Sequence, residues 1–452
     1  MSPKPAIAII SQVYVPDPTA VGQVMADAAT ELARRGFHVV VQTSRSGYDD
    51  PNRQYAERET IDGVDVHRLP FSSFGKRTIL RRLLGAASFL SWAILRTVFR
   101  RHLDGVLVST SPPMCSFAAL VIAAIRRVPI VYWAMDINPD QAIALGTFRP
   151  GSLAVRLLDA LNRTILRRAH RVVALDRFMA ERLQQKQDCN GRMAVIPPWA
   201  VADVSEPVPH ESNPFRREHG LDDKFVLMYS GNMSLAHPLD TILQAAHALS
   251  DRRDLVFLFV GGGLGRKKVE EFIARNGSNN VRLLPYQPLD QLRYSLSAAD
   301  VHLLSMGNDM VGIVHPCKIY GAMECGRPVF LLGPRASHAG ELIERYGIGW
   351  QVEHGDVDGA VATIRQMMAA DPAELGEMGR RARAAIDLDL SKQSLCQAFC
   401  DQVETALASA RFFSSPAELQ PASTEPADSP AHTADTQGAN DERQPAQPSA
   451  RN

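Results

Sequence analysis

The chain of 452 residues is long enough for two or three domains, and its 45% apolar and 22% charged residues are typical of a globular protein. Its 49 basic and 49 acidic residues cancel, so net charge gives no electrostatic basis for binding nucleic acid. The six cysteines lack the spacing of a disulfide scaffold or a zinc site. The sequence contains no run of about 20 uncharged apolar residues, which a transmembrane helix would need. We therefore expect a cytoplasmic protein.

Short apolar runs alternate with helical patterns along most of the chain. The runs lie at residues 6–10, 39–41, 64–66, 106–109, 130–133, 172–175 and 193–196, then at 225–229, 255–260, 281–284, 301–304 and 329–332. Runs rich in β-branched residues that alternate with helices predict parallel sheets built from βαβ units. The sequence therefore predicts an α/β protein.

A polar, proline-containing stretch at residues 200–224 separates the two series of runs and predicts an interdomain linker. We expect one domain at residues 1–199 and a second at 225–390. Residues 414–452 contain six prolines and no aromatic residue, a composition that cannot bury enough apolar surface to fold. We therefore expect a disordered tail.

Loops that follow the strands are the expected ligand-binding segments, because open α/β sheets bind ligands at the carboxyl ends of their strands. Gly22 lies near the start of the first helix, and Gly262 belongs to a glycine-rich loop after the run at 255–260. Each glycine either lets the backbone approach a phosphate or is an ordinary turn residue.

Charged side chains follow two of the strands. Asp136 comes after the run at 130–133, where it either faces the cleft between the domains or forms an Asx turn. Pro316 suits a first helical turn, which places Lys318 where the helix dipole disfavours a cation. Lys318 is therefore either an anion-binding residue or a solvated surface lysine.

Two Asp-x-Asp sequences, at residues 356–358 and 387–389, have the form of a metal-binding pair. The first precedes a helical pattern and is explained by helix capping, and the second lies within the helical C-terminal region. We expect no metal site.

The segment from Arg68 to Arg101 has eight basic residues and no acidic one. Its thirteen uncharged residues between Arg82 and Arg96 would span about 20 Å as a helix, too short for a bilayer core of about 30 Å. This helix either lies in the headgroup region of a membrane or belongs to the core of the first domain. The membrane interpretation uses Arg81, Arg82, Trp92, Arg100 and Arg101.

Seven loop segments stand out when they are taken in order: residues 14–18 with Gly22, 133–140, 195–199, 229–233, 285–288, 295–301 and 316–328. Together these segments resemble retaining glycosyltransferases of the GT-B fold, glycosyltransferase family 4. More narrowly, they resemble bacterial enzymes of the colanic-acid, capsule and O-antigen type that act on lipid-linked acceptors. The resemblance extends over about residues 6 to 405.

The resemblance implies two Rossmann-like domains facing a cleft, with the acceptor held by the first and a nucleotide-sugar, expected to be UDP-linked, held by the second. It implies a helix at 391–413 that crosses back to the first domain, and no cofactor besides the nucleotide-sugar co-substrate. The implied catalytic residues are Lys318, which stabilises the departing diphosphate, and Asp136. The implied donor-binding residues are Gly22, Gly231, Asn232, His237, Gly262, Tyr286, Lys318, Tyr320 and Glu341. A lipid-linked glycan acceptor implies a peripheral position on the inner face of the cytoplasmic membrane.

The sequence also departs from the family pattern. Ile313 and Gly321 stand where the family has a Glu-x7-Glu pair, and Met135 stands where it has a histidine. Glu341 either replaces the lost ribose-binding glutamate or is an acidic residue favoured at a helix start. A nucleotide-sugar epimerase and a non-catalytic relative that binds a nucleotide-sugar remain alternative functions.

Overall fold

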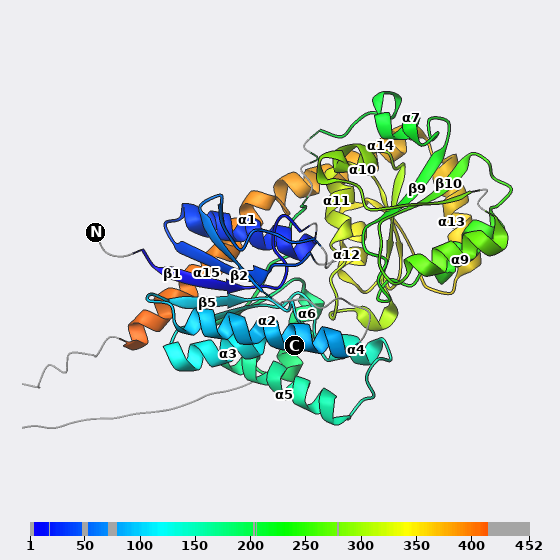
Figure 1. The fold of residues 1–452 in the computed structure, drawn as a ribbon. Helices are drawn as coiled ribbons and strands as arrows, with labels where there is room; N and C mark the ends of the chain where they lie inside the picture. The colour runs from blue at the N-terminus through cyan, green and yellow to red at the C-terminus, as the bar shows by residue number, and fades with distance from the viewer. Residues whose placement is uncertain are drawn as a thin grey trace, which may run out of the picture. The chain divides into compact units, whose positions relative to one another are not determined.

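The computed structural model describes residues 4–17, 19–47, 53–70, 79–201, 204, 206–277 and 280–414 (Figure 1). For residues 79–83 and 410–414 it describes the backbone alone. The predicted disordered tail lies outside the described residues from position 415 onward.

The first domain is built on an eight-stranded sheet with the strand order β3-β4-β2-β1-β5-β6-β7-β8. All neighbours are parallel except β3 and β4. The strands are β1 (Ala6–Ile10), β2 (His38–Ser44), β3 (Arg58–Ile61), β4 (Val64–Leu69), β5 (Gly105–Val108), β6 (Ile130–Trp133), β7 (Arg171–Ala174) and β8 (Met193–Val195). Every residue of β1, β5 and β6 is buried, as expected for parallel strands covered by helices on both faces.

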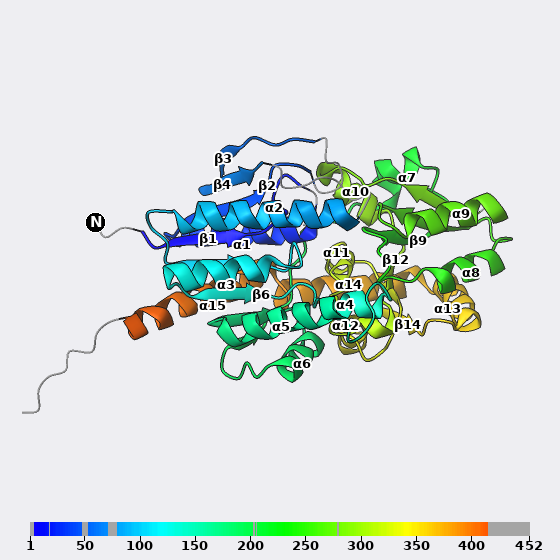
Figure 2. The same cartoon turned by 60° about the horizontal axis from the view of Figure 1, so that its bottom comes forward.

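Six helices connect these strands. They are α1 (Ala20–Arg34), α2 (Ile79–Val98), α3 (Cys115–Arg126), α4 (Asp140–Ala144), α5 (Leu153–Arg168) and α6 (Arg177–Lys186). Both ribbon views show α2, α3 and α5 as neighbouring helices of this domain (Figures 1 and 2). Among the described helices, none is long and apolar enough to cross a membrane.

The second domain has a six-stranded, wholly parallel sheet with the order β11-β10-β9-β12-β13-β14. Its strands are β9 (Phe225–Ser230), β10 (Leu255–Val260), β11 (Val281–Leu284), β12 (Val301–Ser305), β13 (Val329–Leu332) and β14 (Gly349–Val352). Its helices are α8 (Asp240–Ala248), α9 (Arg266–Asn276), α10 (Leu292–Ser297), α11 (Lys318–Glu324), α12 (His338–Tyr346), α13 (Val357–Ala369) and α14 (Pro372–Leu388), with short 3-10 turns η2 (Leu289–Gln291) and η3 (Asn308–Met310). The strand order reverses between β9 and β12, which is where doubly wound sheets bind nucleotides.

Part of the predicted linker is packed into the second domain. It forms η1 (His210–Ser212) and α7 (Pro214–Glu218), and Phe215 joins a buried cluster with residues of β9 and β10. Arg216 is buried as well, because its guanidinium donates to the carbonyls of Ala298 (2.6 Å) and Leu221 (2.6 Å) and lies 3.3 Å from the Asp300 carboxylate. Arg216, one of the charged residues that make this stretch look solvent-exposed in the sequence, therefore has its hydrogen-bonding partners inside the second domain.

The C-terminal helix α15 (Lys392–Ser414) returns to the first domain, as expected for the crossover helix (Figures 1 and 2). Phe399 stacks against Trp133 with ring centroids 3.9 Å apart, and Leu407 packs against Gly105. Arg35, the C-cap of α1, pairs with Asp401 of α15 at 2.6 Å. Two parallel α/β domains and a returning helix confirm the predicted architecture.

Candidate active site

Lys318 is the first residue of α11, the helix that follows β12 after a loop that contains η3. Its Nζ lies 5.2 Å from the ring centroid of Tyr229, and a Cβ atom at Gly231 would lie 2.8 Å from its Cε. Its side chain is partly exposed, but burial of the ammonium lowers the pKa of Lys318 to about 8. Within the described part of the chain, no side chain or carbonyl hydrogen-bonds or ion-pairs with this ammonium. A desolvated cation without a counter-charge favours an anionic ligand.

Glycines bring the loops after β9 and β10 together beside Lys318. Gly231 and Gly261 have φ values of 129° and 134°, which L side chains rarely adopt. A Cβ atom at Gly261 would lie 2.2 Å from the carbonyl oxygen of Gly231, and one at Gly262 would lie 2.8 Å from the ring of Tyr286. Their backbone conformations favour glycine at positions 231 and 261, so the backbone itself forms the wall next to the lysine.

Asn232 joins the same two loops. The hydroxyl of Tyr229 donates to the Asn232 carbonyl at 2.8 Å, and a Cβ atom at Gly263 would lie 2.1 Å from Asn232 Oδ1. The loop after β9 is therefore held against the glycine-rich loop after β10.

His237 lies close enough to Lys318 for their charges to interact. Its Nδ1 is 2.7 Å from the carbonyl oxygen of Ser305, and because a carbonyl can only accept, Nδ1 carries the proton. Burial, with a smaller contribution from the charge of Lys318, holds the pKa of His237 well below its usual value. The neutral ring therefore presents an unprotonated Nε2, which could donate to a phosphate only after an anion favoured its protonation.

The resemblance implied that Tyr320 binds the donor, but its hydroxyl contacts two histidines and not Lys318. The side chain is fully buried, and its hydroxyl lies 2.7 Å from His315 Nε2 and 2.9 Å from His338 Nε2. His315 Nδ1 lies 2.7 Å from Asp176 Oδ2, at the N-terminus of α6 in the first domain. Asp176, His315, Tyr320 and His338 thus form a continuous hydrogen-bonded chain between the domains, which the sequence did not reveal.

Two other implied donor-binding residues already have partners in the chain. Glu341 Oε1 accepts from Nε of Arg177, on α6 of the first domain, at 2.6 Å. The Gly22 backbone N–H donates at 3.2 Å to Oγ1 of Thr19, which caps α1. A ligand would have to displace these partners to use either group.

Asp136 follows β6 at the boundary between the domains. Its backbone forms an isolated antiparallel bridge with Val314 of the second domain, and its N–H donates to Thr110 Oγ1 at 3.1 Å. Its side chain lines a small pocket within the first domain, and burial raises the pKa of Asp136 to about 6.

The described part of the basic segment at 68–101 has one buried face and one exposed face. Helix α2 buries Phe89 and Ala93 in the core of the first domain, whereas Trp92 and Leu95 are 36% and 49% exposed. Arg101 is exposed, Arg100 is half-buried, and burial lowers the pKa of Arg100. The side chains of Arg81 and Arg82 lie outside the described residues.

The carboxylates of the Asp-x-Asp sequences have other roles. Asp356 caps α13 by accepting from the Gly359 N–H at 2.8 Å. Asp387 lies 3.1 Å from Arg383, and Asp389 accepts from the Tyr346 hydroxyl at 2.5 Å. In the described ranges no group of three or more His, Cys, Asp or Glu side chains could hold a metal ion.

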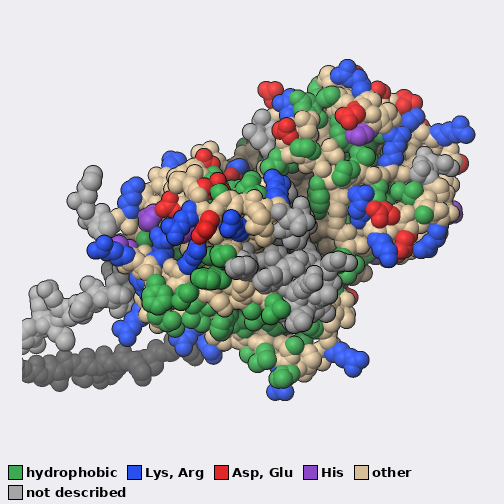
Figure 3. All heavy atoms as spheres, in the orientation of Figure 1, with side chains coloured by type: hydrophobic (Ala, Val, Ile, Leu, Met, Phe, Trp, Pro, Cys, Tyr) green, Lys and Arg blue, Asp and Glu red, His purple; other side chains and the backbone are tan. Residues whose placement is uncertain are grey.

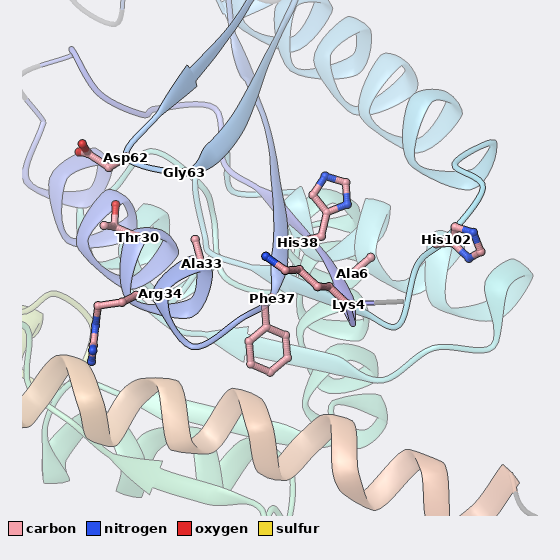
Figure 4. Close-up of a pocket in the computed structure, with 10 residues that line it drawn as sticks. All are labelled: Lys4, Ala6, Thr30, Ala33, Arg34, Phe37, His38, Asp62, Gly63 and His102. Atoms are coloured by element: carbon pink, nitrogen blue, oxygen red, sulfur yellow. The ribbon is translucent and has the colours of Figure 1, made fainter. Parts of the chain in front are cut away.

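A cavity of about 710 Å³ lies at the amino ends of β1 and β2, far along the strands from the loops described above (Figure 4). Of its charged residues, Arg34 pairs with Glu31 at 2.8 Å and His38 pairs with Asp65 at 2.9 Å. The candidate site residues described above lie instead at the opposite, carboxyl ends of the strands.

Two family models match the chain in succession. Residues 19–199 match the Glycosyl transferase 4-like domain, and residues 211–385 match Glycosyl transferases group 1. The chain is 25% identical over 319 residues to the probable glycosyltransferase WbjE of Pseudomonas aeruginosa, covering 70% of this chain and 79% of the relative. It is 24% identical over 404 residues to WcaI of Escherichia coli K12, a glycosyl transferase assigned to colanic acid biosynthesis, covering 86% and 97%.

The fold is similar to that of HepE from Anabaena, solved in complex with UDP-glucose. The TM-score is 0.66 at 17% identity, over 88% of this chain and 99% of that one. Two parallel α/β domains, which the two family models match in order, and a helix that returns to the first domain identify the fold as GT-B. The chain therefore belongs to the glycosyltransferases that combine a glycosyl transferase 4-like domain with a group 1 domain.

Proposed function

We propose that this protein transfers a sugar from a UDP-linked donor, with retention of anomeric configuration, to a lipid-linked glycan during the synthesis of a surface polysaccharide. The observation that carries the proposal is the ammonium of Lys318, which pairs with no carboxylate among the described residues and lies beside the glycine-walled loops after β9 and β10. A nucleotide-sugar is the ligand named for the related HepE structure, and colanic acid biosynthesis is the role assigned to the relative WcaI.

In this proposal, Lys318 stabilises the negative charge that develops on the departing diphosphate. The bond between the sugar C1 and the diphosphate oxygen breaks, and the acceptor hydroxyl oxygen bonds to C1 on the same face. The hydroxyl proton passes to the departing phosphate oxygen, so the reaction needs no dedicated protein base. Preorganised cations and backbone donors suit this role because they need no reorganisation as charge develops.

The lipid-linked acceptor is supported by an apolar surface on the first domain. Exposed apolar side chains lie on three neighbouring helices: Leu84, Trp92 and Leu95 on α2, Phe117 and Ile125 on α3, and Leu153 and Leu157 on α5. The space-filling view shows apolar side chains gathered over α2 and α3 with basic residues around them (Figure 3). Arg101, Arg156 and Arg163 are exposed on or next to these helices. An apolar face with a basic rim suits an anionic membrane surface.

The test is acceptor-dependent release of nucleoside diphosphate. Purified protein is incubated with a panel of nucleotide-sugars and a short-chain polyprenyl-diphosphate sugar, and products are identified by mass spectrometry and NMR. We expect one donor to give UDP and an α- or β-linked product that keeps the donor's configuration. A changed sugar configuration without acceptor would instead indicate an epimerase, and binding without turnover of any donor would indicate a non-catalytic relative.

A further inference from the structure

A small polar pocket lies in the first domain where β5 and β6 end. Thr110 and Asp136 follow these strands, Tyr132 belongs to β6, Ser116 to α3 and Asn162 to α5, and all five line the pocket. The free space is about that of one water molecule, enough for a hydroxyl group but not for a whole sugar ring.

The pocket concentrates hydrogen-bonding groups that the protein leaves unused. Asn162 is only 5% exposed; its Nδ2 donates to the Asn138 carbonyl at 2.7 Å, but its Oδ1 has no partner. Over the residues that the structure describes, neither the Asp136 carboxylate nor the Tyr132 hydroxyl makes a hydrogen bond. Of these three groups, only Asn162 Oδ1 is a buried atom without a partner, whereas Asp136 is half-buried. Burying Asn162 Oδ1 unpaired is unfavourable, which indicates that a water or a ligand hydroxyl satisfies it.

An exposed apolar surface lies on the α3 side of this pocket. Met114, the N-cap of α3, and Phe117 are 36% and 46% exposed, and they flank the lining residue Ser116. On α5, the exposed Leu153 and Leu157 lie on the helix face opposite the buried Asn162. The two helices lie side by side (Figure 2). A ligand that satisfies both surfaces needs a hydroxylated part and an apolar part.

The pocket also lies near the segment that carries Lys318. The Asp136 backbone bridges to Val314, and the N–H of Ile137 donates to the Ile313 carbonyl at 3.0 Å. Asp136 is close enough to Cys317, the neighbour of Lys318, for its charge to act on that thiol. A group held by Asp136 is therefore held at the boundary with the second domain.

We propose that this pocket is an acceptor subsite that takes a hydroxyl group of a sugar carried on a lipid, with the lipid chain lying over the exposed Met114 and Phe117 at the start of α3. This hydroxyl donates its proton to Asn162 Oδ1 and accepts a hydrogen bond from the Tyr132 hydroxyl, while the half-buried Asp136 carboxylate accepts from a neighbouring hydroxyl of the same sugar. This inference rests on the proposed function and assigns the residues that recognise its acceptor.

The kinetic test uses two nearly isosteric variants, Tyr132→Phe and Asp136→Asn. Each should raise the acceptor KM at least about tenfold, because a buried hydrogen bond to a ligand hydroxyl is lost. The affinity for UDP, measured by calorimetry, should not change. Tyr294→Phe on α10 and Asp358→Asn on α13 make the same chemical changes away from the pocket and should leave the acceptor KM at the wild-type value.

Direct binding gives a second test that does not need turnover. Saturation-transfer NMR with octyl glucoside below its micelle concentration should show binding to the wild type and at least about fivefold weaker binding to both pocket variants. Equal binding, or an unchanged acceptor KM together with a lower melting temperature, would show that the pocket holds only a structural water and would overturn the inference. Failure of the proposed function is distinguishable, because it would appear as no nucleoside-diphosphate release by the wild type with any donor.

Discussion

At the residue scale, the ammonium of Lys318 has the clearest expected role. Lys318→Ala should lower kcat/KM by about 100-fold or more, because a charge-assisted contact to a diphosphate contributes about 2–3 kcal/mol in the transition state. The measurement is UDP release, with circular dichroism to verify the fold. Lys267→Ala is the matched control, since that side chain is 82% exposed on α9. Turnover at the wild-type rate in Lys318→Ala would remove this lysine from the mechanism.

The same lysine predicts a pH dependence. Burial lowers the pKa of Lys318 to about 8, so its charged form, which binds the diphosphate, is present below that pH and is lost above it. We expect kcat/KM, which reports the free enzyme, to fall tenfold per pH unit above about pH 8. Lys318→Arg keeps its charge through this range and should move the alkaline limb upward. A flat wild-type profile from pH 7 to 10 would contradict the assignment.

The contacts of the two Asp-x-Asp sequences lead to a prediction about turnover in the presence of a chelator. Because Asp356 caps a helix and Asp387 pairs with Arg383, neither is arranged to hold a divalent ion. We expect turnover to persist in excess EDTA, with the diphosphate charge neutralised by Lys318. Loss of turnover in EDTA that is restored by manganese or magnesium would show that a metal ion takes this role.

At the scale of elements, the chain of Asp176, His315, Tyr320 and His338 connects α6 of the first domain to α11 and α12 of the second. Tyr320→Phe removes the hydroxyl that lies between Nε2 of His315 and Nε2 of His338, and leaving these two nitrogen atoms without that partner should cost about 1–3 kcal/mol of unfolding free energy. Tyr346→Phe is the control: its hydroxyl bonds Asp389 at the surface, so we expect a change below about 0.5 kcal/mol. Urea unfolding measures both.

This prediction separates two roles of Tyr320. If the hydroxyl serves the interdomain chain, stability falls and the UDP affinity of the folded protein changes little. If the hydroxyl binds the donor, as the family resemblance implied, UDP affinity falls while stability is unchanged. Calorimetry on the same samples distinguishes the two results.

At the scale of the whole molecule, the apolar face of α2, α3 and α5 predicts binding to anionic membranes. The protein should pellet with anionic vesicles at low salt and be released at high salt, since each basic residue near the surface contributes about 1 kcal/mol. Reversing Arg81, Arg82, Arg100 and Arg101 to Glu should weaken pelleting without unfolding the protein.

The apolar contribution to membrane binding is tested separately with the double variant Trp92→Ser and Phe117→Ser, which should also bind vesicles more weakly. Leu264→Ser is the control, because Leu264 is 75% exposed on the second domain. A wild-type protein that stays in the supernatant with anionic vesicles at low salt would contradict the membrane prediction.

Local patterns predicted most strands of this protein, but not β3 and β14, nor the helix α7 within the expected linker. Strands such as β1 and β10 are continuous apolar runs between helical patterns, and their alternation alone indicates parallel α/β domains. Lys318 became a candidate anion-binding residue for a local reason as well, because a lysine in a first helical turn opposes the helix dipole, and its role stays a prediction. These features depend on residues close together in the sequence, where spacing determines which side chains share a loop or a face.

Only the tertiary structure decided which distant side chains meet. His315 is 139 residues from Asp176, and Glu341 is 164 residues from its partner Arg177. The order of strands in the two sheets and the contact between the domains determine these pairs, and no local pattern encodes them. The same holds for the pocket at Asn162, because its polar groups come from two strand ends and two helices that adjoin only in the folded protein.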